Sequence, residues 1–271
     1  MRYLWLLCLA AGCEFAVSPS STPGATGAGD DAPGQDPGTG PGPGTAPPPV
    51  CDVTADPSVR LCVTFERDPM VQDLSSYAHT VTEATGITKL SRPDGSPAAS
   101  LTTASRIHIA DDGMFNFNVA QLTIDMWIAP AAGHPGWMLD NNTHYFLDYE
   151  ADGKIRCGFD GKVATSSAAI TDTTWHHVAC TYGSNHELRV YVDGDRSGCV
   201  AINPGTPTSN IGIAIGANYG GDGSYTANYA GGIDNVHVYA RAMSDAEICT
   251  AAGHQGCQVM NCQQGGPGPG E

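Results

Sequence analysis

Basic residues are scarce in this sequence. Of its 271 residues, 12 are Lys or Arg and 28 are Asp or Glu, which gives a formal net charge of −16. Nucleic acid and anionic lipid are disfavoured as partners, because both are repelled by an acidic surface. No run of five or six like charges occurs, so the acidic residues do not form a charged tail.

Long apolar segments and hydrolase motifs are also missing. The apolar run from Tyr3 to Ala11 is shorter than the ~20 residues that a membrane-spanning helix needs. No Gly-x-Ser-x-Gly motif occurs, and His186-Glu187 lacks the second His of a His-Glu-x-x-His zinc site. Cys-x-x-Cys is absent as well, which disfavours a zinc knuckle and a thioredoxin-type site. Because these hydrolase and metal-binding motifs are absent, they assign no activity to the chain.

The N-terminus has the layout of a secretory signal, with a basic Arg2, a short apolar run and small residues before Cys13. The segment Leu9-Ala10-Ala11-Gly12-Cys13 resembles a bacterial lipobox, although Ala10 stands where that motif usually has Leu. We expect residues 1–12 to be a lipoprotein-type signal peptide and Cys13 to take a lipid. The alternative is an ordinary secretory signal in which Cys13 is incidental.

Pro and Gly dominate residues 14–50, and no aromatic or large aliphatic residue occurs between Val17 and Val50. Such a segment cannot bury enough surface to offset its conformational entropy. We therefore expect residues 13–50 to be a lipidated Cys followed by a disordered linker. The chain then forms one domain over 51–262 and ends in a disordered tail over 263–271.

Eight cysteines remain after the signal peptide and Cys13 are set aside, and an even number in an exported chain predicts disulfides. They are Cys51, Cys62, Cys157, Cys180, Cys199, Cys249, Cys257 and Cys262. A bridge between Cys157 and Cys180 fits their alternating positions on successive strands, with Cys199 as a competitor. The other five lie near the two ends of the domain, so at least one bridge joins the two groups or one thiol is free.

Period-two alternation recurs along the domain and predicts short strands. It is clear over Leu122–Ile128, Leu188–Val192 and Ile211–Ile215. Two Asp-Gly turns predict hairpins, because this dipeptide suits the tight turn between two strands. The first pairs Tyr145–Tyr149 with Ile155–Phe159, and the second pairs Leu188–Val192 with Cys199–Ile202. Near the end, Ser244-Asp245-Ala246-Glu247 is a capping box, which predicts a short helix before Gly253.

Three segments resemble bacterial laminin G-like domains of the concanavalin A-like lectin and glucanase superfamily. They are Trp175–Tyr182 with Leu188–Gly194, Gly231–Ser244, and Leu122–Ile128. The resemblance covers about 61–250 and implies an all-β, two-sheet antiparallel jelly-roll sandwich with one short C-terminal helix. From the residues themselves, we expect Trp175 and Val178 to pack in the core and Asp234 to make a structural hydrogen bond.

Catalysis by this domain is not expected. Glucanases of the superfamily place paired carboxylates on one strand face, and glycoside hydrolysis needs two such groups flanking the bond. Glu66-x-Asp68 and Glu150-x-Asp152 begin such a pattern, but neither is followed by a second Glu. His176 and His177 are adjacent on a strand, point to opposite faces and do not easily share a metal.

The expected ligand site consists of two polar loops, Asp140–Thr143 and Asn218–Tyr225. Loops on a rigid sandwich commonly carry such sites. Aromatic faces stack on sugars, and Asn and Asp hydrogen-bond to hydroxyl groups. The expected binding residues are Asp140, Asn141, Tyr219, Asp222 and Tyr225. Carboxylate oxygens suit calcium, so Asp140 and Asp222 are candidate metal ligands. Trp137 either joins this platform or packs in the core, which is the favoured placement.

The expected protein is thus a non-catalytic binding or adhesion module, displayed as a lipoprotein on a bacterial outer membrane or cell envelope, or otherwise secreted or periplasmic. Its expected partners are the membrane, through the lipid, and a glycan or surface protein, and calcium is the candidate cofactor. A structural envelope protein without a ligand and a degenerate glycoside hydrolase are the alternatives.

Overall fold

The computed structural model describes residues 51, 56–116, 121–142, 144–203, 205 and 208–262, all within the unit Thr45–Glu271. The predicted signal peptide, Cys13, the linker up to residue 50 and the tail 263–271 lie outside the described residues. No helix in the described part of the chain is long and apolar enough to cross a membrane.

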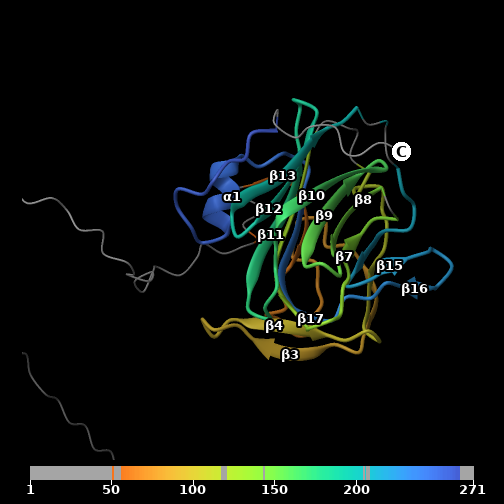
Figure 1. The fold of residues 1–271 in the computed structure, drawn as a ribbon. Coiled ribbons are helices and arrows are strands. Elements are labelled where there is room, and N and C mark those ends of the chain that lie inside the picture. The colour runs from red at the N-terminus through yellow and green to blue at the C-terminus, as the bar shows by residue number, and fades with distance from the viewer. Residues whose placement is uncertain are drawn as a thin grey trace, which may run out of the picture. The chain divides into compact units, whose positions relative to one another are not determined.

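Two antiparallel sheets and one short helix form the domain, which confirms the predicted sandwich (Figure 1). Sheet A has the strand order β13-β12-β11-β6-β17-β4-β3, and β1 also pairs with β17. Its strands are β1 (Val59–Val63), β3 (Thr88–Ser91), β4 (Pro97–Leu101), β6 (Leu122–Pro130), β11 (His176–Tyr182), β12 (Glu187–Val192), β13 (Asp195–Ala201) and β17 (Gly231–Tyr239).

Sheet B has the order β10-β9-β8-β7-β14-β5-β2. Its strands are β2 (Val81–Thr85), β5 (Arg106–Ile109), β7 (Gly136–Asp140), β8 (Tyr145–Tyr149), β9 (Lys154–Phe159), β10 (Lys162–Ala169) and β14 (Ile213–Ile215). A separate hairpin of β15 (Asn218–Tyr219) and β16 (Tyr225–Thr226) projects beside β7 (Figure 1).

Alternate residues of the strands fill the space between the sheets. Leu122, Ile124, Met126 and Ile128 of β6 are fully buried in one core cluster with Ile107 and other residues of sheet B. Each such side chain contributes about 1.5–3 kcal/mol through removal of its apolar surface from water. The period-two pattern therefore identified the inward face of this strand.

One predicted core residue lies elsewhere. Val178 is fully buried, but Trp175 is half-buried on the outer face of sheet A, before β11 begins. The Trp175 ring packs on Gly232, and a side chain at position 232 would overlap it. The Arg92 guanidinium lies 5.6 Å from the ring centroid. The aromatic ring is thus held by a glycine and a cation and does not enter the core.

Both predicted hairpins are present. Tyr145 pairs with Phe159 and Tyr149 with Ile155 across the first. In the second, Leu188 pairs with Val200, and β13 begins earlier than predicted, at Asp195. The strand predicted over Ile211–Ile215 is shorter, because Gly212 has φ +77°, a value outside the β region.

The predicted capping box forms at the start of α1 (Asp245–Ala251). The Glu247 amide donates to Ser244 Oγ at 3.3 Å, and the Ser244 amide donates to the Glu247 carboxylate at 2.8 Å. The helix ends at Ala252, before Gly253 at φ +76°. Ile248 packs on the outer face of sheet A in a second apolar cluster with Tyr191 and Tyr239.

The eight cysteines form four bridges: Cys51–Cys62, Cys157–Cys180, Cys199–Cys262 and Cys249–Cys257. The second of these joins β9 to β11, and so links the two sheets through the core. The third joins β13 to the C-terminal segment, so one bridge does connect the two groups of cysteines.

Candidate functional site

Tyr219 and Tyr225 form an aromatic pair on the β15–β16 hairpin. They are direct cross-strand partners, and their ring centroids are 4.8 Å apart. Both tyrosines are half-buried. The turn between them is Gly-rich, and Asp222 at its tip accepts a hydrogen bond of 2.9 Å from the Ser224 amide. The hairpin thus presents two adjacent rings.

Tyr225 is held by two residues of sheet B. Its hydroxyl donates a hydrogen bond of 2.8 Å to Glu83 Oε2, and the guanidinium carbon of Arg106 lies 4.9 Å from its ring centroid. Burial and the carboxylate of Glu83 raise the pKa of Tyr225, so the phenol stays protonated as a donor. A ring, a cation and a carboxylate therefore lie together at this edge.

Tyr219 packs on His108 of β5, with ring centroids 4.5 Å apart. One nitrogen of His108, Nε2, faces the carbonyl of Ile211, which only accepts, so Nε2 donates there. The other nitrogen, Nδ1, lies 2.6 Å from the Thr82 hydroxyl, which donates to it. Both ring nitrogens have hydrogen-bond partners, which hold the imidazole in place against Tyr219.

Asp140 and Asn141 lie behind the hairpin and do not project from it. Each side chain is about 1% exposed. Asp140 Oδ2 accepts a hydrogen bond of 3.2 Å from the Tyr219 amide, and Asn141 Nδ2 donates to the Gly212 carbonyl at 2.9 Å. Asp140 thus fastens the backbone at Tyr219 and Asn141 fastens the chain just before β14, while Asp222 lies exposed at the hairpin tip.

Groups of three or more Cys, His, Asp or Glu side chains close enough to share a metal are rare in the described part of the chain. One is found, made of Cys51, Cys62 and His237. Asp140 and Asp222 belong to no such group there, and calcium binding by these two residues stays a prediction.

A second aromatic pair lies on the same outer face of sheet B. Trp137, expected in the core, is half-buried, and its ring centroid is 4.4 Å from that of Phe146. The β7–β8 register is irregular between Trp137 and Leu139. Because of this irregularity, Trp137 does not point into the core as strict alternation with Leu139 would require. Phe146 lies over Gly158 of β9, where an added Cβ would overlap the ring.

Two carboxylates of the β8–β9 hairpin, Asp148 and Glu150, are paired with one cation. Arg156 pairs with Asp148 and, at 2.6 Å, with Glu150. Burial raises the pKa of Asp148, although the Arg156 guanidinium opposes the shift. Asp152 lies in the exposed turn and caps the Lys154 amide at 3.1 Å. This cluster is an ion-pair network in which Arg156 bridges the carboxylates.

Two buried His–Asp clusters were missed by the sequence analysis. In the first, Asp125 of β6 accepts from His177 at 3.2 Å and from His237 at 3.1 Å. Burial raises the pKa of Asp125, but the two imidazoles outweigh burial and hold it below its ordinary value. These residues come together only through the order of the strands in sheet A. Period-two patterning shows that each is a polar residue in an apolar strand, but it does not show that they are neighbours.

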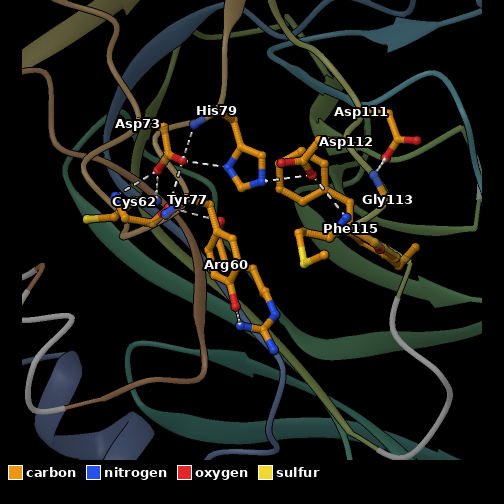
Figure 2. A network of polar contacts seen from close by, with 12 residues as sticks. Arg60, Cys62, Asp73, Tyr77, His79, Asp111, Asp112, Gly113 and Phe115 are labelled. Carbon is orange, nitrogen blue, oxygen red and sulfur yellow. Dashed lines mark hydrogen bonds and ion pairs between the residues drawn. The ribbon is translucent and has the colours of Figure 1, made fainter.

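In the second cluster, the imidazole of His79 lies between Asp73 and Asp112, at 2.5 Å and 3.2 Å (Figure 2). Burial raises the pKa of Asp73, but donors from His79, Ser75 and the backbone lower it overall. The ring also stacks on Phe115, with centroids 4.2 Å apart. The cluster fastens the segment before β2 to the loop after β5.

Solved structures with the same fold include binding domains. The binding domain of Paraclostridial mosquitocidal protein 1 is 18% identical, with a TM-score of 0.58, and the match covers 72% of this chain and 52% of that one. A structure of botulinum neurotoxin type C, whose cell entry is described as dependent upon interaction with two ganglioside molecules, is 13% identical, with a TM-score of 0.57 and coverage of 74% and 52%. The chain thus spans about half the length of these toxin structures.

A shorter structure is matched along nearly its whole length. Domain 4 of AbnA, an extracellular arabinanase from Geobacillus stearothermophilus, was solved in complex with arabinotriose. It is 18% identical, with a TM-score of 0.55, and the match covers 72% of this chain and 98% of that domain. Identities this low show a shared fold. No curated protein matches the sequence significantly.

The sequence itself matches a family over more than half its length. The family described as the concanavalin A-like lectin/glucanases superfamily matches residues 101–249, from the end of β4 into α1. This range contains β6, β11, β12 and β17, which are the strands that carried the sequence resemblance. The chain belongs to the concanavalin A-like lectin/glucanases superfamily.

Proposed function

We propose that this domain is a non-catalytic carbohydrate-binding module and that the Tyr219–Tyr225 pair is its binding surface. The observation that carries the proposal is the pair itself, two half-buried tyrosines with ring centroids 4.8 Å apart, beside Arg106 and Glu83. Aromatic rings stack on the C–H faces of sugars, and the charged groups beside them bind hydroxyls. The binding roles named for structures of the same fold support this class of function.

Each ring is pre-positioned, which favours binding because little ordering is left to be done. His108 supports Tyr219 from below, and Glu83 holds the hydroxyl of Tyr225. Asp140 and Asn141 contribute from behind, by fastening the backbone at Tyr219 and the chain just before β14. Their part in binding is therefore to position the platform, while Asp222 at the hairpin tip is placed to contact a ligand directly.

The test is a glycan array followed by calorimetric titration with the best oligosaccharide, with arabinotriose and a ganglioside headgroup included. Tyr219→Ala and Tyr225→Ala should each weaken binding by about 30-fold, since truncating an aromatic anchor costs on the order of 2 kcal/mol. Tyr77→Ala is the matched control, because Tyr77 is also half-buried but contacts Arg60 elsewhere. Wild-type protein that binds no glycan, or Tyr→Ala variants that bind equally well, would contradict the proposal.

Calcium assistance through Asp140 and Asp222 is tested in the same titration. Oligosaccharide affinity should fall when calcium is replaced by a chelator, and Asp222→Asn should reproduce that fall in the presence of calcium. A flat calorimetric trace for calcium alone, with unchanged glycan affinity in chelator, would reject this part of the proposal.

Display on a cell envelope forms the last part of the proposal. Cys13 would carry a lipid, residues 14–50 would act as a spacer, and the bridged domain would lie beyond them, in an oxidising compartment that suits its four disulfides. Cys13→Ala should shift the protein from the membrane fraction to the soluble fraction and abolish labelling by a fatty-acid probe. Unchanged fractionation and labelling would reject the anchor and leave a secreted module.

A further inference from the structure

Cys62, His237 and Asp125 form one row across the outer face of sheet A. His237 of β17 is the direct cross-strand partner of Cys62 on β1 and of Asp125 on β6. Their neighbours Leu61, Val236 and Ile124 point the other way, into the core between the sheets. All three side chains of the row are buried.

The backbone holds Cys62 against His237. The Cys62 amide donates to Asp73 Oδ1 at 3.0 Å (Figure 2). The Cys62 carbonyl accepts from the Leu74 amide at 2.7 Å. Both backbone groups therefore face away from β17, which makes Cys62 and His237 a non-hydrogen-bonded pair. Side chains approach most closely in pairs of this kind.

The two nitrogens of His237 have different surroundings. Nδ1 lies 3.1 Å from Asp125 Oδ1, and an ionised carboxylate only accepts, so Nδ1 carries the hydrogen. That leaves a lone pair on Nε2, which is buried and has no hydrogen-bond partner among the described residues. A ring nitrogen of His237 and the sulfurs of Cys51 and Cys62 all lie within 4.8 Å of one another.

We propose that reduction of the Cys51–Cys62 bridge turns this cluster into a zinc site with three protein ligands, two thiolates and His237 Nε2. Tetrahedral zinc with Zn–S bonds of about 2.3 Å places two sulfurs about 3.8 Å apart, so the two sulfurs, bonded to each other in the intact bridge, must separate after reduction. Cys51 is half-buried and lies outside the strands, so it is the ligand that moves when the bridge opens.

Asp125 has the position of a supporting group in this site. Zinc-bound histidines commonly donate their other N–H to a carboxylate, which fixes the tautomer and the ring orientation. Asp125 does this for His237 while the bridge is intact, so the imidazole is already oriented for a metal. The unpartnered nitrogen, the adjacent sulfur pair and the carboxylate behind the ring are separate observations that favour the same site.

The chemistry is a two-step exchange. A dithiol reductant transfers two electrons and two protons to the bridge, giving two thiols and the oxidised reductant. Zn²⁺ then binds both sulfurs as thiolates, and two protons are released to solvent. The metal and the disulfide use the same sulfurs and exclude each other. Zinc would thus occupy the site only in the chain that has not yet been oxidised or has met a reductant.

Cobalt is the probe, because thiolate ligation gives Co²⁺ an intense near-ultraviolet charge-transfer band. Protein is reduced with a phosphine, freed of it under anaerobic conditions and titrated with Co²⁺, then with Zn²⁺ to displace it. His237→Gln is compared with His176→Gln, which removes a half-buried imidazole that contacts Asp172 and Asp193 on the same sheet. Melting of the oxidised variants checks that each one folds.

We expect no thiolate band when oxidised protein is titrated with Co²⁺. Reduced wild type and reduced His176→Gln should show a band that includes one equivalent of Co²⁺ bound in a His237-dependent way. Reduced His237→Gln should lack that equivalent. Asp125→Asn should keep the equivalent but weaken it about 10–100-fold. The other reduced cysteines contribute equally to all variants, so the comparison isolates the site. Reduced wild type without a band, or equal titrations for His237→Gln and His176→Gln, would overturn the proposal. Should His237→Gln fail to fold, loss of the same equivalent in Cys51→Ser supports the site, and its retention overturns it.

Discussion

The hydroxyl of Tyr225 donates a hydrogen bond to Glu83, 142 residues earlier in the chain, and so fastens the β15–β16 hairpin to β2. Tyr225→Phe removes this bond and keeps the ring, and should lower the free energy of unfolding by about 1 kcal/mol. Glu83→Gln keeps an acceptor and should cost less. Urea unfolding measures both, and a Tyr225→Phe variant as stable as wild type would show that the bond does not hold the hairpin.

The buried carboxyl of Asp234 should make stability depend on pH. Burial raises the pKa of Asp234 to about 6, although the Arg92 guanidinium lies 3.3 Å away and opposes the shift. Since the pKa is higher in the folded state than in the unfolded state, the native protein binds the extra proton between pH about 4 and 6. The stabilisation is therefore complete below this window and is lost as pH rises through it, by about 3 kcal/mol.

Asp234→Asn should remove most of that fall, while Asp222→Asn, at an exposed hairpin tip, should leave it unchanged. Urea unfolding at pH 4.5 and at pH 7 gives the comparison. Equal differences between the two pH values in wild type and Asp234→Asn would show that this carboxyl is not the source.

Removal of the Cys157–Cys180 bridge between the sheets should lower the free energy of unfolding more than removal of the Cys249–Cys257 bridge beside α1. Cys157→Ala/Cys180→Ala opens a link of sequence separation 23 and should cost about 3 kcal/mol or more, because both sulfurs also fill the core. Cys249→Ala/Cys257→Ala, with a separation of 8, should cost about 2.5 kcal/mol. Calorimetric melting of the two double variants tests the order, and the reverse order would contradict it.

Gly158 should be intolerant of a side chain. An added Cβ would overlap the ring of Phe146, whose centroid lies 4.4 Å from that of Trp137. Gly158→Ala should therefore cost about 1–3 kcal/mol by overpacking and change the Trp fluorescence. Val163→Ala is the control, because Val163 pairs with Gly158 across β9 and β10 but is 40% exposed. Unchanged fluorescence in Gly158→Ala would place Phe146 elsewhere.

Local signals predicted much of the fold. The Asp-Gly turns and the capping box act over a few residues, and both hairpins and the helix follow them. Gly212 shows the limit of alternation, since one residue of positive φ ends a strand that the pattern extends.

Only the part of the candidate site that lies within one short segment of the chain could be predicted from the sequence. Tyr219 and Tyr225 stood out because both flank one Gly-rich turn. Glu83 and His108 could not be assigned to them, because that contact depends on the order of strands in sheet B. The polarity of Asn141 favours an open loop, but the residue is buried and its Nδ2 donates to the Gly212 carbonyl.

The placement of β17 has a consequence for how the domain is made. This strand is formed by residues 231–239, yet it lies in sheet A between β6 and β4 and also pairs with β1. The sheet therefore lacks a central member until those residues have been synthesised, and contacts across such long sequence separations form slowly. Assembly of the sandwich should thus follow synthesis of residue 239, so the earlier strands wait for the last one before sheet A is complete.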